Sequence, residues 1–445
     1  MITHAPLPKW GTLLRAFILR PKDLRSNMAQ SWLQEGETAG WFSRSAWSLA
    51  RIVLWLQAKK EKASVTLWVP DFFCNASLAP LRALKVKLVF YPVTHELHPD
   101  YVTCRKLAKV HPPDLFIFIH YFGRPMEAAP ARDFCSQQGT WMVEDAAHVL
   151  RPVAGVGKYG DFVLYSPHKL LPLPDGAVLV ARPNGPAKFG ADGLCELGEP
   201  QKWASSLKRY DFDETLIVRG HTGLLPIWLG KRLLQKLGVG GRGQSGPFPE
   251  SDYDVESTKI LLPEPSMSGL AKRLLPVNLH EEARWRQRHQ LLWDELLLEG
   301  LTSELGPIKA TERSQHCEWA PYFATYSVEP KSAQSAYESM QQAGIPVMTW
   351  PDLPPEVCAH KEKHGEAWSL RHSRIHLPLH QSLRSRDLLA LMKRSAKHLD
   401  QSKEDIELKW GTATRDQWQA WMRQTCRSNL LQSWAYGEAK AKIEG

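Results

Sequence analysis

Short apolar stretches alternate with longer amphipathic ones between residues 65 and 182. Clusters of β-branched and aromatic residues predict strands at Val65–Val69, Lys87–Tyr91, Asp114–His120, Thr140–Glu144, Asp161–Ser166 and Ala177–Ala181. Between several of them lie segments long enough for one helix each, namely Asn75–Leu84, Pro99–Val110 and Met126–Gln138. Because strand–helix–strand units at this spacing form parallel sheets with right-handed crossovers, we predict an α/β fold with a mostly parallel sheet.

The pattern on either side of this region is less regular. Ser45–Lys59 predicts a buried helix, whereas residues 182–263 carry a weak pattern that includes a Gly-rich loop at 238–251. Beyond it we predict helices at Met267–Leu275, His280–Leu298, Ala333–Ala343 and Arg384–Leu399, and extended segments at Tyr322–Val328 and Ile375–His380. We therefore predict a large domain over residues 1–275, with 182–263 as a variable substrate region, a smaller α+β domain over 276–400, and an appendage over 401–445.

Composition narrows the class of protein. The chain has 445 residues, of which 43% are hydrophobic and 23% charged, so it is long enough for two or three folded domains. Its net charge of +9 comes from scattered basic residues, which most simply indicates a soluble basic protein; an anionic small-molecule partner is the next interpretation, ahead of nucleic acid. No apolar run approaches the roughly 20 residues that a membrane-spanning helix needs. Seven cysteines without a CxxC pair indicate neither a disulfide framework nor a metal site, so we expect a reducing cytoplasm.

Chemically active side chains follow several of the predicted strands, and ligands of open α/β sheets bind at the carboxyl ends of strands. The segments that follow strands are Pro70–Cys74, Tyr121–Pro125, Asp145–His148 and Pro167–Lys169. An acid, an imidazole, hydroxyls, aromatic rings and a lysine thus come to one edge of one sheet. This convergence predicts a cofactor site that needs a carboxylate and an amine.

Each candidate in this set also has a plainer explanation. Lys169 fits a Schiff-base lysine and a surface loop lysine equally well. Asp145 fits an ion pair with a protonated ring nitrogen, although a helix N-cap is the simpler interpretation. Ser45 and Ala46 begin an apolar helix, so they could hold a phosphate or simply cap the helix. Ser166 could add a phosphate donor or bond to backbone.

Aromatic residues follow the first predicted strand of the sheet. Phe72 and Phe73 could stack on a planar ring, but two phenylalanines after a strand are more often part of the core. Asp71 between Pro70 and these rings fits a turn equally well.

At these residues the chain resembles a known family. VEDAAH (143–148) and GKYGDFVLYSPHKLLPLPDGAVLV (157–180) are similar to the signature of the DegT/DnrJ/StrS aminotransferases, and weaker collinear matches extend from about residue 41 to 399. These are pyridoxal-phosphate enzymes of the aspartate-aminotransferase fold (fold type I), and many aminate nucleotide-linked keto-sugars. The resemblance implies that fold for the large domain, pyridoxal 5′-phosphate as cofactor, glutamate as amino donor, a keto-sugar as acceptor, and a homodimer.

The resemblance also implies roles for individual residues. Lys169 would be the catalytic lysine that holds the cofactor in an internal aldimine, and Asp145 would pair with the pyridine nitrogen. His148 would lie near the ring hydroxyl, and Phe73 would stack on the ring. The phosphate would be held by Ser166, Ser45 and Ala46. The candidates for substrate contact are Arg44, Arg124 and His120.

The sequence also departs from the family pattern. Fewer residues than usual separate Ser166 from Lys169, and the loop after the lysine reads Pro174-Asp175-Gly176-Ala177 instead of Gly-Glu-Gly-Gly. Arg44 stands where glycine is common, and Glu264 falls near a position where the family has an asparagine that reaches the partner subunit's cofactor phosphate.

Two alternatives to an aminotransferase remain open. The short spacing between Ser166 and Lys169 is also found in cysteine-desulfurase-like enzymes, which would need a reactive cysteine such as Cys317 or Cys358. The chain could also be a non-catalytic cofactor-binding module fused to an acyltransferase. Residues 418–442 resemble the opening of a FemAB-like or GNAT-type acyltransferase domain and then stop.

Overall fold

The computed structural model describes residues 5–18, 28–61, 64–187, 212–213, 217–220, 224–237, 248–249, 260–276, 279–300, 309–310, 319–342, 344–384 and 388. All of them belong to one compact unit, Met1–Ser395. The predicted appendage at 401–445 lies outside the described residues, as do most of the predicted loop at 238–251 and of the predicted helix at 384–399. The division at residue 275 into two domains stays a prediction.

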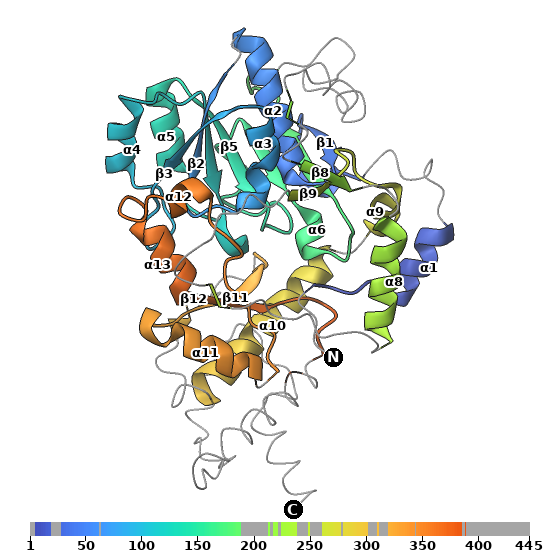
Figure 1. Ribbon diagram of the computed structural model, residues 1–445. Helices are drawn as coiled ribbons and strands as arrows, with labels where there is room; N and C mark the ends of the chain where they lie inside the picture. The colour runs from blue at the N-terminus through green and yellow to red at the C-terminus, as the bar shows by residue number, and fades with distance from the viewer. Residues whose placement is uncertain are drawn as a thin grey trace, which may run out of the picture. The chain divides into compact units, whose positions relative to one another are not determined.

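A seven-stranded sheet in the order β1-β7-β6-β5-β4-β2-β3 forms the framework (Figure 1). Its strands are β1 (Thr38–Phe42), β2 (Thr66–Pro70), β3 (Lys87–Tyr91), β4 (Leu115–Ile119), β5 (Trp141–Ala146), β6 (Phe162–Tyr165) and β7 (Ala177–Ala181). Strands β2 to β6 pair in parallel, whereas β7 is antiparallel to both of its neighbours. The prediction of a mostly parallel sheet is therefore confirmed, and β1 is an edge strand that the sequence pattern did not indicate.

Helices pack on the strands because each presents an apolar face to them. The helices that contact this sheet are α2 (Ser45–Lys60), α4 (Tyr101–Ala108), α5 (Ala129–Gln138) and α6 (Pro167–Leu170). Asp100 caps α4 by accepting hydrogen bonds from the Val102 and Thr103 N–H groups, and Gly139 ends α5 at a positive φ of 62°. The predicted helix at 75–84 is instead a 3-10 turn, η3 (Asn75–Leu78), followed by α3 (Ala79–Ala83).

A second sheet is antiparallel and contains β10 (Lys309–Ala310), β11 (Phe323–Ser327) and β12 (Arg374–Pro378). The helices of this part of the chain are α10 (Leu279–Gly300), α11 (Pro330–Gln342), α12 (Pro355–Cys358) and α13 (Gly365–Ser373). Strand and helix predictions for residues 280–298, 322–328, 333–343 and 375–380 are thus confirmed in type. The mixture of helices with antiparallel strands agrees with the predicted α+β character.

Further elements lie before the first sheet, in the connection between β4 and β5, and between the two sheets. They are α1 (Trp10–Ile18), η2 (Gln30–Trp32), η4 (Tyr121–Gly123), α8 (Leu224–Lys236), α9 (Gly269–Leu274), and a parallel pair, β8 (Ile217–Gly220) with β9 (Ile260–Pro263). The weak pattern of residues 182–263 therefore contains regular elements. Within the described residues, no helix combines the length and the apolar character that crossing a bilayer requires.

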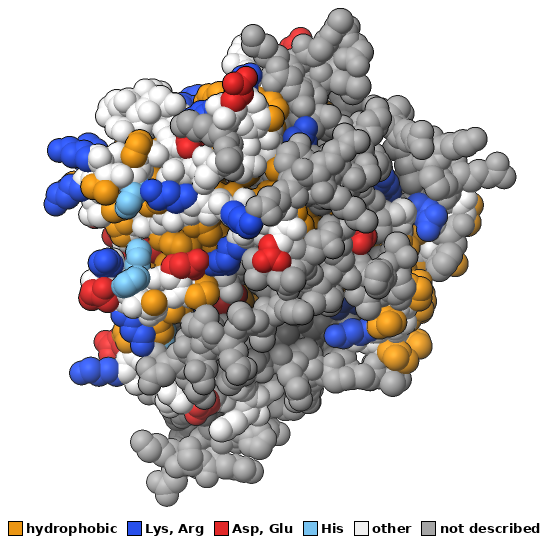
Figure 2. Space-filling model, turned by 45° about the horizontal axis from the view of Figure 1, so that its top comes forward, with side chains coloured by type: hydrophobic (Ala, Val, Ile, Leu, Met, Phe, Trp, Pro, Cys, Tyr) orange, Lys and Arg blue, Asp and Glu red, His pale blue; other side chains and the backbone are white. Residues whose placement is uncertain are grey.

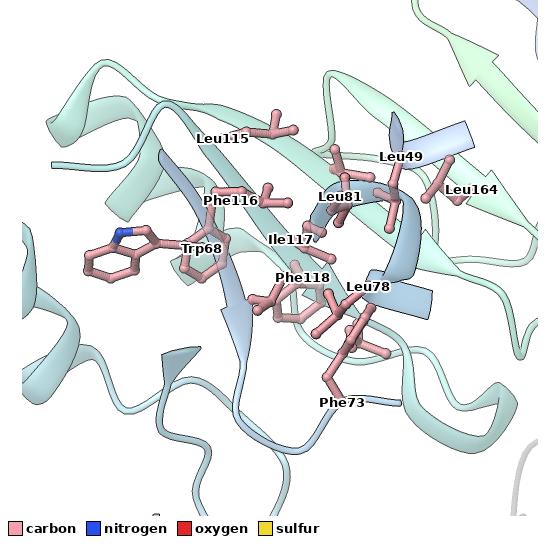
Figure 3. Packing of buried hydrophobic residues seen from close by; sticks show 14 of the residues in the cluster. Leu49, Trp68, Phe73, Leu78, Leu81, Leu115, Phe116, Ile117, Phe118 and Leu164 are labelled. Atoms are coloured by element: carbon pink, nitrogen blue, oxygen red, sulfur yellow. The ribbon is translucent and has the colours of Figure 1, made fainter. Parts of the chain in front are cut away.

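The largest hydrophobic cluster fills the space between the seven-stranded sheet and its helices. Every residue of β4 is buried, as expected for a parallel strand covered on both faces. Figure 3 shows Trp68 beside Phe116 of this strand. The Trp68 ring lies 5.8 Å from that of Phe134, and its Nε1–H donates to the His111 carbonyl over 3.0 Å. The Trp68 ring is therefore packed in the core, and its N–H group has a hydrogen-bond partner there.

We expect Trp68→Ala to lower the free energy of unfolding by about 3–5 kcal/mol, because it leaves a large cavity in a close-packed core. Trp10→Ala is the matched control, since that ring is 51% exposed and its loss costs less than about 1 kcal/mol. Urea unfolding followed by far-UV circular dichroism measures both. Equal losses in the two variants would contradict this description of the core.

Candidate active site

The ends of β5 and β6 bring two predicted site residues to one edge of the sheet. Asp145 is paired in register with Leu164, and Ala146 with Tyr165, so the chain leaves both strands at the same level. From β6 it passes through Ser166 directly into α6, a single turn that contains Lys169. The Lys169 N–H donates to the Ser166 carbonyl over 2.9 Å. The short spacing between Ser166 and Lys169 is thus one helical turn.

Lys169 and His148 are in direct contact, with 3.3 Å between the amine Nζ and the imidazole Nε2. The other imidazole nitrogen, Nδ1, accepts a hydrogen bond from the Phe122 N–H over 3.3 Å. A neutral imidazole has one donor and one acceptor nitrogen, so this contact assigns the proton to Nε2. The Nε2–H group therefore faces the Lys169 side chain.

The surroundings of His148 keep its ring neutral and fixed in orientation. Burial lowers its pKa far below the ordinary value, and the charges of Lys169 and His376 lower it further. The Tyr322 ring is stacked on the imidazole with centroids 4.5 Å apart and planes 15° apart. His148 is thus a hydrogen-bond donor whose position is set by the ring of Tyr322 and the backbone of Phe122.

The Asp145 carboxyl group is buried and only partly compensated. It is 6% exposed, and its Oδ1 accepts a hydrogen bond from the Ala147 N–H over 2.9 Å. Burial raises its pKa above the ordinary value, and the charge of Lys169 lowers the pKa in part. A buried carboxylate is costly unless a cation or several donors face it. A protonated ring nitrogen placed between Asp145 and Lys169 would supply such a cation, so this residue fits a pyridoxal-type cofactor.

The start of α2 lies against the loop that follows Lys169. The Gly176 N–H donates to the Ser43 carbonyl over 2.8 Å, and both terminal nitrogens of Arg44 donate to the Pro174 carbonyl over 3.1 Å. The first N–H groups of a helix, here those of Ser45 and Ala46, have no carbonyl partner within the helix. Together with the helix dipole they suit a phosphate group.

Polar side chains near the start of α2 support this fit. Among the side chains that the structure describes, the Ser43 and Ser48 hydroxyls are buried without a hydrogen-bond partner. The Ser166 side chain is fully buried, and its Oγ lies 3.4 Å from Nδ1 of His168. Oxygen atoms of a phosphate would give buried hydroxyls a partner, which is what such groups require.

Arg44 contributes to the structure of this loop. Its guanidinium is half-buried and holds the carbonyls of Ser43 and Pro174. Burial lowers its pKa, and the charge of Asp175 opposes that shift. Asp175 in turn accepts a hydrogen bond from the Ser268 N–H over 2.8 Å, at the start of α9. These contacts account for the position of Arg44 without a substrate, and its substrate contact stays a prediction.

His120 and Glu144 form a fully buried pair, with 2.8 Å between His120 Nε2 and Glu144 Oε2. The Met126 N–H donates to the other imidazole nitrogen over 2.9 Å. Glu144 also accepts hydrogen bonds from the Gly157, Tyr159 and Gly160 N–H groups. His120 has no exposed surface and both its nitrogens are engaged, so neither nitrogen is free to contact a substrate.

The aromatic turn after β2 differs from expectation. Phe73 lies in the hydrophobic cluster, where Figure 3 shows it with Leu78 and Phe118, so its predicted stacking on a cofactor ring is not supported. The charge of Lys169 acts on the thiol of the following residue, Cys74. Burial and then the charge of Asp352 raise the pKa of this thiol to about 12, although the charge of Lys169 lowers it in part. Nothing in the sequence pattern distinguished Cys74 from its neighbours.

Two further candidates from the sequence are Arg124 and Glu264. Arg124 is half-buried after η4, close to the Phe122 backbone that fixes His148. Glu264 lies between Pro263, whose carbonyl accepts from Trp47 Nε1, and Pro265, whose carbonyl accepts from the Ser43 N–H. Its backbone therefore runs along the start of α2, near the predicted phosphate position.

The cysteines of the desulfurase alternative gain no support. Cys358 is buried in α12, and burial raises the pKa of its thiol, whereas a persulfide-forming cysteine needs an accessible thiolate. Cys317 lies outside the described residues. Within the described part of the chain, no group of three or more His, Cys, Asp or Glu side chains could hold a metal ion.

Known proteins share this fold. No protein-family model matches the chain, and no curated protein matches its sequence. Among solved structures, the aminotransferase TlmJ from Streptoalloteichus hindustanus is similar with a TM-score of 0.59 and 17% identity, covering 90% of this chain and 100% of that one. A DegT/DnrJ/EryC1/StrS aminotransferase from Brucella abortus has a TM-score of 0.54 and 14% identity, covering 85% and 89%.

A third similar structure is a Streptococcus pneumoniae protein assigned as a sugar aminotransferase in its pyridoxal-phosphate form, with a TM-score of 0.57 and 13% identity, covering 91% of this chain and 100% of that one. The chain therefore has the fold of the type I pyridoxal-phosphate aminotransferases. The resemblance noted in the sequence is confirmed at the level of the fold.

We expect Glu144→Gln to lower the free energy of unfolding at pH 7 by about 2–3 kcal/mol, because the amide nitrogen would face backbone N–H donors. Burial alone would raise the pKa of Glu144, but the hydrogen bonds from His120, Gly160 and Tyr159 bring it below the ordinary value of 4.5. The stabilisation by Glu144 is thus complete above pH 4.5 and is lost as the pH falls through the lower folded-state pKa.

Urea unfolding of wild type and Glu144→Gln between pH 7 and pH 4 measures this difference, which should narrow only at the acidic end. A control is Glu127→Gln on the exposed surface, which should leave stability unchanged at every pH. A gap between wild type and Glu144→Gln that stays constant down to the lowest pH would contradict the assigned hydrogen bonds.

Proposed function

We propose that this protein is a pyridoxal-phosphate-dependent aminotransferase that transfers an amino group, with glutamate as donor, to a keto-sugar. The observation that carries the proposal is the convergence of the Lys169 amine, the buried Asp145 carboxyl group and the start of α2 at one sheet edge. The fold shared with aminotransferases supports it.

The residues present would hold the cofactor by three kinds of contact. The phosphate would lie at the Ser45 and Ala46 N–H groups, with the Ser166 hydroxyl as a further donor. Asp145 would accept a hydrogen bond from the protonated ring nitrogen and neutralise its charge. His148 would donate from Nε2 toward the ring hydroxyl.

Pyridoxal phosphate, when bound, supplies an electron-withdrawing ring that stabilises negative charge on the carbon atom next to the transferred nitrogen. Lys169 Nζ is the group that would take the proton from that carbon and return it to the carbon on the other side of the transferred nitrogen. His148 Nε2 lies 3.3 Å from this amine, so the imidazole borders the position where the proton is moved. The Tyr322 ring shields the same region from water by covering the imidazole.

The substrates follow from the resemblance and from charge. A nucleotide-linked sugar carries phosphate groups, which suit a chain of net charge +9. Arg124 remains the candidate for such a contact, since it is half-buried near the His148 end of the site. Surface-polysaccharide or secondary-metabolite sugar synthesis is the setting in which this reaction would occur.

We further propose a cytoplasmic homodimer. Cys74, Cys104, Cys135 and Cys358 are free thiols, as in proteins kept in a reducing compartment. In the related family, the residue near the position of Glu264 reaches the cofactor phosphate of the partner subunit, which supports a homodimer. Sedimentation of the full chain would determine the number of subunits.

The first test of this function concerns Lys169. Wild-type protein should shift the visible absorption of added pyridoxal phosphate, and borohydride treatment should leave a pyridoxyl group on Lys169 that peptide mass spectrometry locates. Lys169→Ala should show neither effect. Lys272→Ala, which removes a lysine of α9, is the control and should behave as wild type. Labelling of another lysine in the wild type would refute the assignment.

The second test concerns Asp145. We expect Asp145→Asn to slow the single-turnover amination of a keto-sugar panel by about a hundredfold or more, since a neutral amide cannot hold the ring nitrogen in its cationic form. Asp133→Asn, an exposed acid on α5, is the isosteric control. Unchanged rates in Asp145→Asn, measured under cofactor saturation, would exclude this role.

A further inference from the structure

Two neighbouring helices, α1 and α8, expose large apolar side chains to solvent. On α1 these are Trp10, Leu14 and Ile18, at 51%, 64% and 79% exposure. On α8 and directly after it they are Ile227, Leu234 and Leu237, at 66%, 50% and 65%. In each helix the spacing is close to whole turns, so the residues form a stripe along one side.

The opposite side of α1 is apolar as well. Leu13 and Ala16 are buried in the second hydrophobic cluster, against which Trp228, Leu229 and Leu233 of α8 also pack. One apolar side of each helix is therefore packed against the second hydrophobic cluster. A helix on the surface of a soluble protein normally turns polar residues outward, so the outer stripes are not explained by the core.

The two stripes belong to one surface. Lys236 near the end of α8 donates to the Pro8 carbonyl, just before α1, over 2.8 Å, and its Nζ lies 5.1 Å from the centre of the Trp10 ring. Figure 1 shows α1 and α8 side by side, and Figure 2 shows hydrophobic side chains gathered on that side of the molecule. We name this surface, made of Trp10, Leu14, Ile18, Ile227, Lys231, Leu234 and Leu237, the α1–α8 face.

Within α1 and α8 the charged side chains have one sign, and just before α1 Lys9 is paired with Glu281 of α10 over 2.8 Å. Neither helix contains an acidic residue, whereas α8 carries Lys231, Arg232 and Lys236. Lys231 is exposed and lies on the same side of the helix as Ile227 and Leu234, four residues after the first and three before the second. An aromatic ring, aliphatic side chains and lysines on one helical surface form the pattern of a segment that lies in the interface of an anionic bilayer.

We propose that the α1–α8 face docks on the surface of a membrane that contains anionic lipids. Trp10 and the aliphatic side chains would enter the headgroup region, and Lys231 would meet lipid phosphates. A second copy of this chain fits less well, because a two-fold contact between identical faces would bring the lysines of one copy toward those of the other. The proposal is independent of the function proposed above.

The experiment is flotation of the full chain with phosphatidylcholine vesicles, prepared with and without phosphatidylglycerol. Wild type should float with the anionic vesicles and far less with the neutral ones, and added salt should release it. Lys231→Glu should lower the partition coefficient by about tenfold or more, since it reverses one charge at the surface. Leu14→Glu/Ile227→Glu/Leu234→Glu should lower it at least as much.

Val102→Glu/Val110→Glu is the matched control, because these two residues are 59% and 69% exposed in and after α4, away from the α1–α8 face. It should float as wild type does. Thermal unfolding of each variant separates loss of binding from loss of folding, and a charge-conserving Lys231→Arg variant should bind normally.

Three results would overturn the proposal. One is a wild-type chain that stays unbound with both kinds of vesicle. Another is equal loss of flotation in the α4 control. The third is a wild-type oligomer that Leu14→Glu/Ile227→Glu/Leu234→Glu dissociates in the absence of lipid, which would assign the α1–α8 face to a second copy. Cofactor binding by the variants shows whether the proposed active site is affected, so failure of one proposal is distinguishable from failure of the other.

Discussion

Two consecutive carboxyl groups on β5, those of Glu144 and Asp145, have opposite electrostatic surroundings, and the site depends on this contrast. Successive residues of a strand point to opposite faces of the sheet. Glu144 points to the face where His120 and three backbone N–H groups satisfy its oxygens, so its pKa is lowered. Asp145 points to the other face, where burial dominates and its pKa is raised.

This contrast separates a structural carboxylate from one that is available for chemistry. Glu144 holds the segment Gly157–Gly160, which leads into β6, and through His120 it also holds the turn that begins at Tyr121. Those two segments lead to Lys169 and to Phe122, whose N–H fixes the tautomer of His148. The hydrogen bonds of Glu144 thus position the groups around Asp145 without satisfying Asp145 itself. A carboxylate left in this state has a strong preference for a cationic ligand.

The strands of the large sheet could be predicted because buried parallel strands are continuous apolar runs, as in LFIFI of β4. The edge strand β1 could not, because TAGWF contains a glycine and buries only Phe42. The order of the chain also brought Asp145, Ser166 and Lys169 to one sheet edge, since strand ends meet there. The direction of each side chain was beyond the sequence. Phe73 and Cys74 follow the same strand, and only packing decides that the Phe73 ring is enclosed in the core while Cys74 is partly buried against it.

Two departures from the related family, far apart in the sequence, meet in the structure. Arg44 stands at the start of α2 where glycine is common, and Pro174-Asp175 stands in the loop after Lys169. The Arg44 guanidinium donates to the Pro174 carbonyl, while the charge of Asp175 opposes the lowering of the Arg44 pKa that burial causes. Each change therefore supplies what the other requires, since a buried guanidinium needs acceptors and a carboxylate in a buried loop needs a cation.

The contact between Arg44 and Pro174 also affects the predicted phosphate position. The Gly176 N–H bonds to Ser43, so the Arg44–Pro174 contact fixes the distance between the first turn of α2 and the turn that carries Lys169. A cofactor bound at both ends, by its phosphate and by its reactive carbon, needs that distance to be constant. In this chain an arginine and a proline loop provide a constraint that glycines could not provide, because glycine adds backbone freedom and offers no side-chain donor.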